Sequence, residues 1–223
     1  MDLRFDKVIE YLPLLLQGTK LTIQLTVIAV GCGTVIGLFI SLMRLSRFRP
    51  FSLAARCYTD FFRGTPLLTQ IVLFYYGLPQ LLGLNSFSAY FSASLTLSLN
   101  SGAYIAEIFR AGIQSIHKGQ MEAARSLGMT YSQAMRYIIL PQAFKRSIPP
   151  LGNEFIAMLK DSSLVSVITL QELMMSGKII VGRNFRAFET YIIVAFIYLV
   201  MTTTISQFVS YLERVFGKDD HGE

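Results

Sequence analysis

Three long stretches of the chain contain no charged side chain: residues 21–43, 65–106 and 190–212. A helix needs about 20 mostly apolar residues to cross the hydrocarbon core of a bilayer, so the first and last stretches predict one membrane-spanning helix each. The middle stretch is too long for a single crossing. A turn-forming cluster, Gly-Leu-Asn-Ser at residues 83–86, divides it. We therefore predict two spans there, at about residues 65–82 and 87–108.

Another apolar stretch, at about residues 148–170, contains charged residues but has the length of a crossing. With it, the sequence predicts an all-α integral membrane protein whose residues 1–223 form a single transmembrane domain. A long polar loop at about residues 110–147 joins the third and fourth spans. The five predicted transmembrane helices lie at about residues 21–43, 65–82, 87–108, 148–170 and 190–212.

The segment before the first span is amphipathic. Residues 5–16 mix apolar side chains with Asp6 and Glu10 at helical spacing. This segment can lie along the outer interface or pack on the helix bundle, and the sequence leaves both open. We expect Gly18 and Thr19 to break it from the first span. No small-residue cleavage motif follows the first apolar stretch, which indicates a retained span rather than a signal peptide.

The composition agrees with a membrane protein. Hydrophobic residues make up 52% of the chain and charged residues 15%, against about 25% charged residues in an average soluble domain. The net charge of +6 could indicate nucleic-acid binding, but an excess of Lys and Arg in cytoplasmic loops explains it better, and we expect no nucleic acid partner. Cys32 and Cys57 have neither disulfide nor zinc spacing.

The basic residues also predict the orientation. With the N-terminus outside and the C-terminus inside, most of the 20 Lys and Arg side chains fall on the inner side of the membrane. The opposite orientation, or a count that differs by one helix, is the alternative.

The loop between the third and fourth spans is predicted to contain two helices. The Glu-Ala-Ala-Arg-Ser-Leu run at residues 122–127 favours a helix, and Gly128 is a good helix terminator. Thr130, followed three residues later by Gln133, is a capping-box pattern that begins a second helix. We expect Pro141 to end that second helix.

The second of these helices has an apolar face. A protein partner or the chain's own bundle can cover such a face, and the residues alone favour neither. The side chains on this face are Ala134, Met135, Ile138 and Ile139.

The spacing in this loop resembles the EAA loop of ABC importer permeases. Glu-Ala-Ala is followed by three residues, a glycine, nine residues, an isoleucine, one residue and Leu-Pro. In that family the loop forms a coupling helix that docks in a groove of a cytoplasmic ATPase. The residues to which the resemblance assigns this ATPase-coupling role are Glu122, Ala123, Ala124, Gly128, Leu140 and Pro141.

Four other segments resemble the polar amino acid permeases of the histidine, glutamine and arginine type: residues 18–19, 62–67, 101–113 and 160–164. The resemblance covers about residues 15–212 and implies the type I ABC importer permease fold. It also implies import of a polar amino acid by alternating access, in the bacterial cytoplasmic (inner) membrane.

The same resemblance implies a set of partners: a cytoplasmic ABC ATPase dimer, a second permease copy or paralogue, an extracytoplasmic amino-acid-binding protein, the amino acid solute and the lipid bilayer. It implies that this chain is no enzyme and binds no cofactor, because ATP and Mg²⁺ are held by the partner ATPase. The sequence agrees, since the Ser-Gly-Lys-Ile run at residues 176–179 lacks the glycine and hydroxyl residue of a Walker loop.

Charged residues within the fourth span are candidates for the solute site, because ionisable groups inside a membrane are expensive and usually functional. Glu154 and Asp161 lie about two helical turns apart and so share a face. Asp-Ser-Ser at residues 161–163 is an N-cap pattern, and a helix break there would offer N–H groups to a substrate carboxylate. The candidate solute-binding residues are Asp161, Glu154, Lys160, Asn100, Thr65, Leu67, Gln70 and Ser163.

Structural roles compete with these assignments. The charged residues of the fourth span can pair with other helices, and a buried Asn100 can simply bridge helices. Glu107, close to Arg110, is predicted to form a salt bridge at the inner interface. The Gly-xxx-Gly pair at residues 33–37 is typical of helix packing.

Two acidic groups near the predicted site favour a cationic amino acid as the solute. A polar neutral amino acid is the nearest alternative, because the acids could bind the α-amino group that all amino acids share. An ion-coupled secondary carrier is a second alternative, in which Glu154, Lys160 and Asp161 would form a relay, but the EAA-like loop has no role in it. We expect no membrane enzyme, since the sequence shows no catalytic cluster at a membrane surface.

Overall fold

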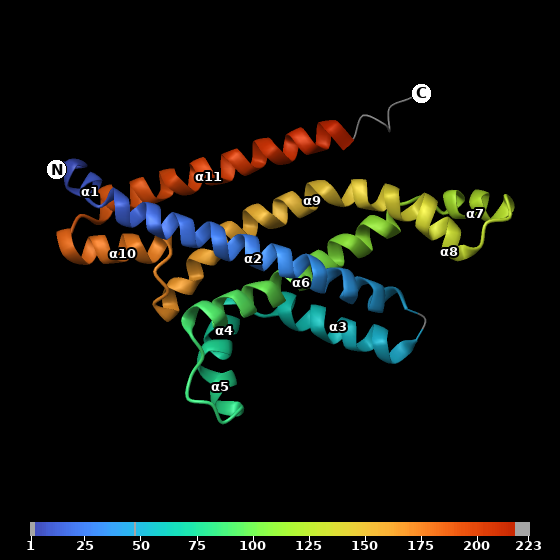
Figure 1. The fold of residues 1–223 in the computed structure, drawn as a ribbon, viewed down its shortest axis with the longest axis horizontal. Helices are drawn as coiled ribbons and strands as arrows, with labels where there is room; N and C mark the ends of the chain where they lie inside the picture. Colours follow the sequence, from blue (N-terminus) through green and yellow to red (C-terminus); the bar gives the residue numbers. More distant parts are fainter. Residues whose placement is uncertain (1–2, 47, 217–223) are drawn as a thin grey trace.

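The structure, a computed structural model, describes residues 3–46 and 48–216, and all regular elements within these residues are helices (Figure 1). α2, α3, α6, α9 and α11 run roughly along the long axis; α7 and α8 lie at one end, and α1 and α10 at the other. The elements are α1 (Asp6–Ile9), α2 (Leu12–Leu45), α3 (Arg49–Gly64), α4 (Leu67–Val72), the π-helical η1 (Leu73–Gly77), α5 (Leu78–Leu81), α6 (Ala89–Gln114), α7 (Lys118–Ser126), α8 (Tyr131–Ala134), the π-helical η2 (Met135–Ile139), α9 (Leu140–Asp161), the 3-10 helix η3 (Ser162–Ile168), α10 (Leu173–Asn184) and α11 (Ala187–Phe216).

Two of these helices are long and apolar enough to cross a membrane, α2 and the Ala187–Val215 part of α11. A third candidate is a bent pair, in which the helix over Tyr131–Ile168 meets α10 at 50°. The apolar helix over Leu67–Leu81 is about 22 Å long at 1.5 Å per residue, which is less than the hydrocarbon thickness of about 30 Å. By length and composition, the described residues therefore contain two or three candidate spans, and five are not established on this basis.

α2 and α6 pack closely through small residues. A Cβ atom on Gly37 would lie 2.8 Å from Ile105 Cγ2 and 2.9 Å from the backbone nitrogen of Ala106. A Cβ atom on Gly33 would lie 3.0 Å from Ser101 Cβ. The two glycines therefore allow the backbones to approach each other, which confirms the predicted packing role of this pair.

The predicted break at Gly18 and Thr19 is wrong, because α2 runs unbroken through both residues. Gly18 permits a close contact instead: a Cβ atom there would lie 2.9 Å from the carbonyl oxygen of Glu172. Val8 and Leu15 are fully buried in a cluster with apolar residues of α10 and α11. Of the two alternatives for the N-terminal segment, the structure therefore shows packing on the bundle.

α3 was not predicted from the sequence, because it lies in the arginine-containing segment between the first two predicted spans. Pro50 stands in its first turn, where a missing N–H group costs little. Ala55, Thr59 and Phe62 are buried on one face of α3, which packs against α2 and α6. The spacing of four and three residues is the ordinary amphipathic pattern.

The predicted turn at residues 83–86 is confirmed. Gly83 has φ +67°, a left-handed conformation that glycine adopts without a steric penalty. Ser88 then caps α6, because its Oγ accepts a hydrogen bond of 3.2 Å from the N–H of Phe91.

Both predicted helices of the long loop are present. α7 ends before Gly128, which has φ +84°. Thr130 and Gln133 form the predicted capping box: the Gln133 N–H donates to Thr130 Oγ1, and the Thr130 N–H donates to Gln133 Oε1. These local signals in the sequence are confirmed.

Pro141 does not end the second helix, contrary to the prediction. α8, η2 and α9 follow one another directly, and the helix continues over Tyr131–Ile168. A proline inside an α-helix removes a donor and crowds the carbonyl group four residues earlier. The wider π turn over Met135–Ile139 lies at that point, and we attribute the tolerance of Pro141 to it.

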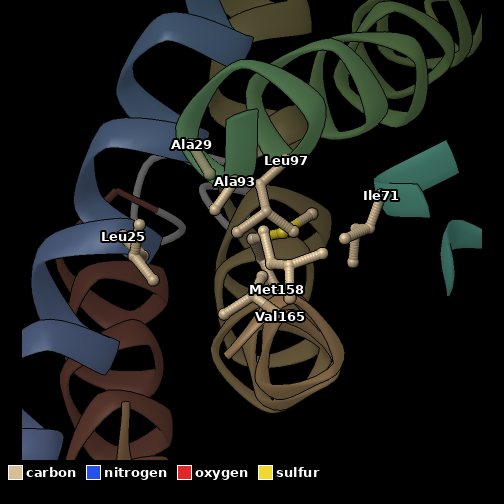
Figure 2. Close-up of a cluster of buried hydrophobic side chains, with 8 residues drawn as sticks. Leu25, Ala29, Ile71, Ala93, Leu97, Met158 and Val165 are labelled. Atoms are coloured by element: carbon tan, nitrogen blue, oxygen red, sulfur yellow. The ribbon is translucent and has the colours of Figure 1, made fainter. Parts of the chain in front are cut away.

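The main apolar core lies where α2, α4, α6, α9 and η3 meet (Figure 2). Figure 2 shows Leu97 of α6 beside Met158 and Val165 of the α9–η3 helix. This core holds the α9–η3 helix, which carries half of the candidate solute-binding residues, against α6. Its buried members are Leu25, Ala29, Ile71, Ala93, Leu97, Met158, Val165 and Ile168.

Candidate functional site

Gln70 fills a break between α3 and α4. The chain leaves the helical conformation at Thr65, with φ −118° and ψ 148°, and Pro66 has no N–H to satisfy the carbonyl groups at the end of α3. The side-chain nitrogen of Gln70 donates to the carbonyl oxygens of Phe62 at 2.9 Å and Thr65 at 3.1 Å, and to Thr65 Oγ1 at 2.8 Å. Gln70 is 1% exposed, so a single buried side chain supplies the partners that the break removes.

Asn100 connects α6 to the same break. Its side-chain nitrogen donates to the Phe62 carbonyl oxygen at 3.2 Å and to Gln70 Oε1 at 2.9 Å. The structure thus brings three predicted residues, Thr65, Gln70 and Asn100, into one buried network. The helix-bridging role considered for Asn100 is observed.

Glu154 is a carboxylate buried between α9 and α6. It is 9% exposed and accepts a hydrogen bond of 2.9 Å from Ser101 Oγ. Because Ser101 follows Asn100 on α6, Glu154 contacts that helix one residue from the network at the break. Among the described residues, no basic side chain pairs with Glu154. A buried carboxylate without such a partner is energetically expensive, and this makes it a candidate for binding a positive group.

Asp161 and Lys160, at the end of α9, are exposed in the single chain. The predicted N-cap at Asp161 is wrong, because its backbone is helical (φ −67°, ψ −24°) and its side chain caps no N–H group. The Ser162 N–H is already bonded to the carbonyl oxygens of Lys160 and Met158. The helix tightens into η3 here and ends only at Thr169, which has φ +60°. The N–H groups expected to receive a carboxylate at this point are therefore occupied.

The two remaining candidates, Leu67 and Ser163, are half-buried. Leu67 packs against the main apolar core. The other six predicted residues form a network at the break (Thr65, Gln70 and Asn100), a buried carboxylate beside it (Glu154) and an exposed pair (Lys160 and Asp161).

Glu172 is a fully buried carboxylate that the sequence analysis missed. It caps α10 by accepting the N–H groups of Met174 at 2.8 Å and Met175 at 2.7 Å, and it accepts the Tyr198 hydroxyl of α11 at 3.1 Å. Glutamate is not among the preferred N-cap residues, so no pattern pointed to it. Glu172 fixes the start of α10 just beyond the bend that follows η3.

Glu107 is the centre of a cluster of ion pairs from three helices. Its carboxylate pairs with Arg110 at 2.7 Å, Arg44 at 3.1 Å and Arg63 at 3.8 Å. The guanidinium of Arg63 also lies over the ring of Tyr104, 5.3 Å from the centroid. The predicted pairing of Glu107 with Arg110 is confirmed. The other two partners were missed because Arg44 is distant in the sequence and Arg63 lies on the unforeseen α3.

The chain itself covers the apolar face of α8 and η2. Ala134 and Ile139 are buried, and Ile139 clusters with Ile116 and Ala143. This observation favours the bundle over a partner for that face. The EAA-like residues are more open: Ala124 is buried, whereas exposed positions are Glu122, Ala123, Gly128, Leu140 and Pro141. Within residues 3–46 and 48–216, no group of His, Cys, Asp and Glu side chains could hold a metal ion.

Residues 33–218 match the family of binding-protein-dependent transport system inner membrane components. The chain belongs to this family. It is the permease component of an ABC transporter, in which a separate subunit hydrolyses ATP, and it binds no cofactor itself. This membership leaves the ion-coupled carrier without support.

Similar proteins are known from several bacteria. The arginine transport system permease protein ArtQ of Bacillus subtilis (strain 168) is 40% identical over 220 residues, which cover 99% of this chain and 100% of ArtQ. The glutamine transport system permease protein GlnP of Escherichia coli (strain K12) is 39% identical over 203 residues, covering 91% of this chain and 93% of GlnP. A chain in a crystal structure of an amino acid ABC transporter with histidines is 49% identical, with a TM-score of 0.92 over 96% of this chain and 99% of that one.

These likenesses confirm the resemblance drawn from the EAA-like loop and from residues 18–19, 62–67, 101–113 and 160–164. The permease is of the polar amino acid type and is a multi-pass protein of the bacterial inner membrane.

Proposed function

We propose that this permease imports a polar amino acid of the kind for which its relatives are named, and that a cationic amino acid fits best. The choice of a cation rests on Glu154, which is buried and has no basic partner among the described residues. Asp161, a second carboxylate on the same helix, is exposed. A polar neutral amino acid is the second candidate. Supporting it, GlnP is named for glutamine, and a carboxylate can hold any α-amino group.

The roles of the site residues follow from their charges and positions. Seven residues separate Glu154 from Asp161, which is about 10 Å along the helix. The amino group and the cationic side chain of an extended amino acid can reach two carboxylates at that separation. Lys160 is exposed and suited to the α-carboxylate, while Ser163 and Leu67 line the approach. Thr65, Gln70 and Asn100 form the polar wall at the helix break.

The proposed topology has five crossings, at about residues 21–43, 65–82, 87–108, 148–170 and 190–212, with the N-terminus outside and the C-terminus inside. The helix of the second crossing, Leu67–Leu81, is short, so α3 extends this crossing toward the inner side of the membrane. A discontinuous helix at a solute site is typical of transporters, and the break between α3 and α4 lies beside Asn100.

The proposed partners are an ATPase dimer, a second permease copy or paralogue, and an extracytoplasmic amino-acid-binding protein. Supporting the first, α7 presents exposed Glu122 and Ala123, and Leu127 after it is 85% exposed. Docking of α7 on the ATPase would transmit closure of the two ATPase subunits to the helices. The supporting observation for a second permease is the exposure of Asp161 and Lys160, which a partner copy would enclose.

The test is uptake by proteoliposomes that contain the permease with its ATPase and binding protein. ATP-driven uptake of each of the 20 amino acids is measured for the wild type, Glu154→Gln, Asp161→Asn and the control Asp60→Asn. Asp60 is an exposed carboxylate of α3 outside the site. We expect uptake of arginine, lysine or histidine, with KM raised at least tenfold in both site variants and unchanged in Asp60→Asn.

Uptake of glutamine alone would favour the neutral solute. Unchanged KM and kcat in both site variants would reject the assignment of the two carboxylates. Absence of ATP-driven uptake of any amino acid by the wild type would reject the proposed function.

A further inference from the structure

A cavity of about 630 Å³ lies between α6 and α9, with Arg63 at the end of α3 also in its wall, and this wall is rich in arginine. Three positive side chains and one negative one leave the wall with two net positive charges. The aromatic ring of Tyr104 forms another part of the wall. The charged lining residues are Arg63, Arg110, Arg146 and Glu107.

The single carboxylate does not neutralise these arginines. Glu107 Oε2 accepts two hydrogen bonds from Arg110, at 2.9 and 2.7 Å. Its other oxygen faces Arg44, which does not line the cavity. Arg63 only approaches Glu107, at 3.8 Å, and its side chain is 44% exposed. Arg146 donates from one nitrogen to the Ser115 carbonyl oxygen at 2.7 Å. A guanidinium has five N–H donors, so both arginines keep donors for a ligand.

The cavity lies in line with the proposed solute site along two helices. On α6, Tyr104 and Glu107 follow Asn100 by four and seven residues, which places all three on one face. On α9, Arg146 precedes Glu154 by eight residues, or about two turns. The cavity is therefore displaced from the solute site by about 6–12 Å, toward the end of the molecule that carries α7 and α8.

We propose that this cavity is a second solute site, in which Arg63 and Arg146 bind the α-carboxylate of an amino acid after it leaves Glu154. The proposal rests on the function proposed above. Guanidinium groups match a carboxylate in charge and in geometry. The path thus leads from a site with two carboxylates and one lysine to a wall with net positive charge, where the α-carboxylate passes from Lys160 to Arg63 and Arg146.

The electrostatic part of the proposal is tested with a single cysteine in the cavity wall. Ala111 is exposed there, and Ala111→Cys is combined with Cys32→Ser and Cys57→Ser in the purified permease–ATPase complex without nucleotide. We measure the rates of modification by an anionic and a cationic methanethiosulfonate. The anionic-to-cationic ratio should exceed that of free cysteine and fall about fourfold with Arg63→Gln. Arg56→Gln, on the same helix but outside the cavity wall, should leave it unchanged.

The ligand part is tested by protection of the same cysteine. L-Arginine and L-histidine should slow its modification, whereas agmatine and histamine, which lack the carboxylate, should not. Arg63→Gln should weaken this protection at least fivefold while Glu107 keeps its pairs with Arg44 and Arg110. Arg146→Gln serves as an independent second variant and should act in the same way.

Equal protection by the amines, undiminished protection in both arginine variants, or a charge ratio that does not change would each overturn the carboxylate site. Uptake is measured in parallel with the wild-type complex in proteoliposomes. Uptake without protection rejects only the second site, whereas absence of amino acid uptake rejects the proposed function on which it rests.

Discussion

Substitutions of Gly128 separate the effect of backbone strain from that of surface bulk at the turn between α7 and α8. The φ of Gly128 is +84°, and nothing lies within 4 Å of a Cβ atom placed there. Alanine therefore meets no neighbour, but the left-handed backbone costs about 1–2 kcal/mol. Such a cost changes the equilibrium of the turn about 5- to 30-fold. Leucine carries the same backbone cost and adds bulk to the surface that we propose to dock on the ATPase. Asparagine tolerates this conformation better and should cost less.

The assay is the number of ATP molecules hydrolysed per amino acid taken up, measured in proteoliposomes with equal amounts of inserted permease. We expect this number to rise in the order asparagine, alanine, leucine, while insertion stays normal. Gly31→Ala is the matched control, because Gly31 also has nothing within 4 Å but its φ is not positive. Wild-type coupling in Gly128→Ala would refute the strain argument. If leucine were no worse than alanine, bulk at the proposed docking surface would have no effect.

Two further substitutions test packing and a buried hydrogen bond. Gly37→Leu should lower the free energy of unfolding by about 1–3 kcal/mol through overpacking, because even a Cβ atom would lie 2.9 Å from the Ala106 nitrogen. Thermal unfolding in detergent measures this loss of stability. Tyr198→Phe removes the hydroxyl that donates to Glu172 at 3.1 Å and should cost about 1 kcal/mol, seen as a lower Tm of the purified permease.

Each of these substitutions has a control within the chain. Gly31→Leu places the same side chain on α2 at an open position, and a loss equal to that of Gly37→Leu would contradict the packing argument. Tyr211→Phe removes a hydroxyl from a residue of α11 that is 58% exposed. An equal fall in Tm for Tyr211→Phe would mean that the hydrogen bond to Glu172 does not explain the loss of stability in Tyr198→Phe.

The features that could be predicted from the sequence depend on neighbouring residues. Local residues alone determine three of these features: the capping box of Thr130 and Gln133, the left-handed Gly128 and the turn at Gly83. A short sequence pattern was therefore enough to predict them. The long apolar runs likewise predicted α2 and α11. The EAA-like spacing identified the family because the loop is a continuous segment.

The features that were missed depend on contacts between distant segments. The sequence pattern predicted that Gly18 breaks the helix, but this glycine instead permits a close contact with the backbone of Glu172, the N-cap residue of α10. Two of the three partners of Glu107, Arg44 and Arg63, lie on other helices, and the helix that carries Arg63 was not predicted. Pro141 follows a π turn, and no sequence pattern that we considered distinguishes such a turn from an ordinary helix end.

The grouping of the candidate site residues was missed for the same reason. Sequence placed Gln70 and Asn100 on the right helices, but their hydrogen bonds to the Phe62 carbonyl oxygen require a break whose exact shape comes from tertiary packing. The N-cap expected at Asp161 failed because an α-helix can tighten into a 3-10 helix without releasing its N–H groups.

The unbroken helix over Tyr131–Ile168 gives the permease a lever arm. It begins next to the loop that follows α7 and carries Glu154 and Asp161 further along. From Tyr131 to Glu154 the distance along the axis is about 35 Å at 1.5 Å per residue. A tilt of about 10° about the loop end would therefore move Glu154 by about 6 Å, which is comparable to the length of an amino acid. A small rotation imposed at one membrane surface is thus sufficient to open or close a site for the solute deep in the bundle.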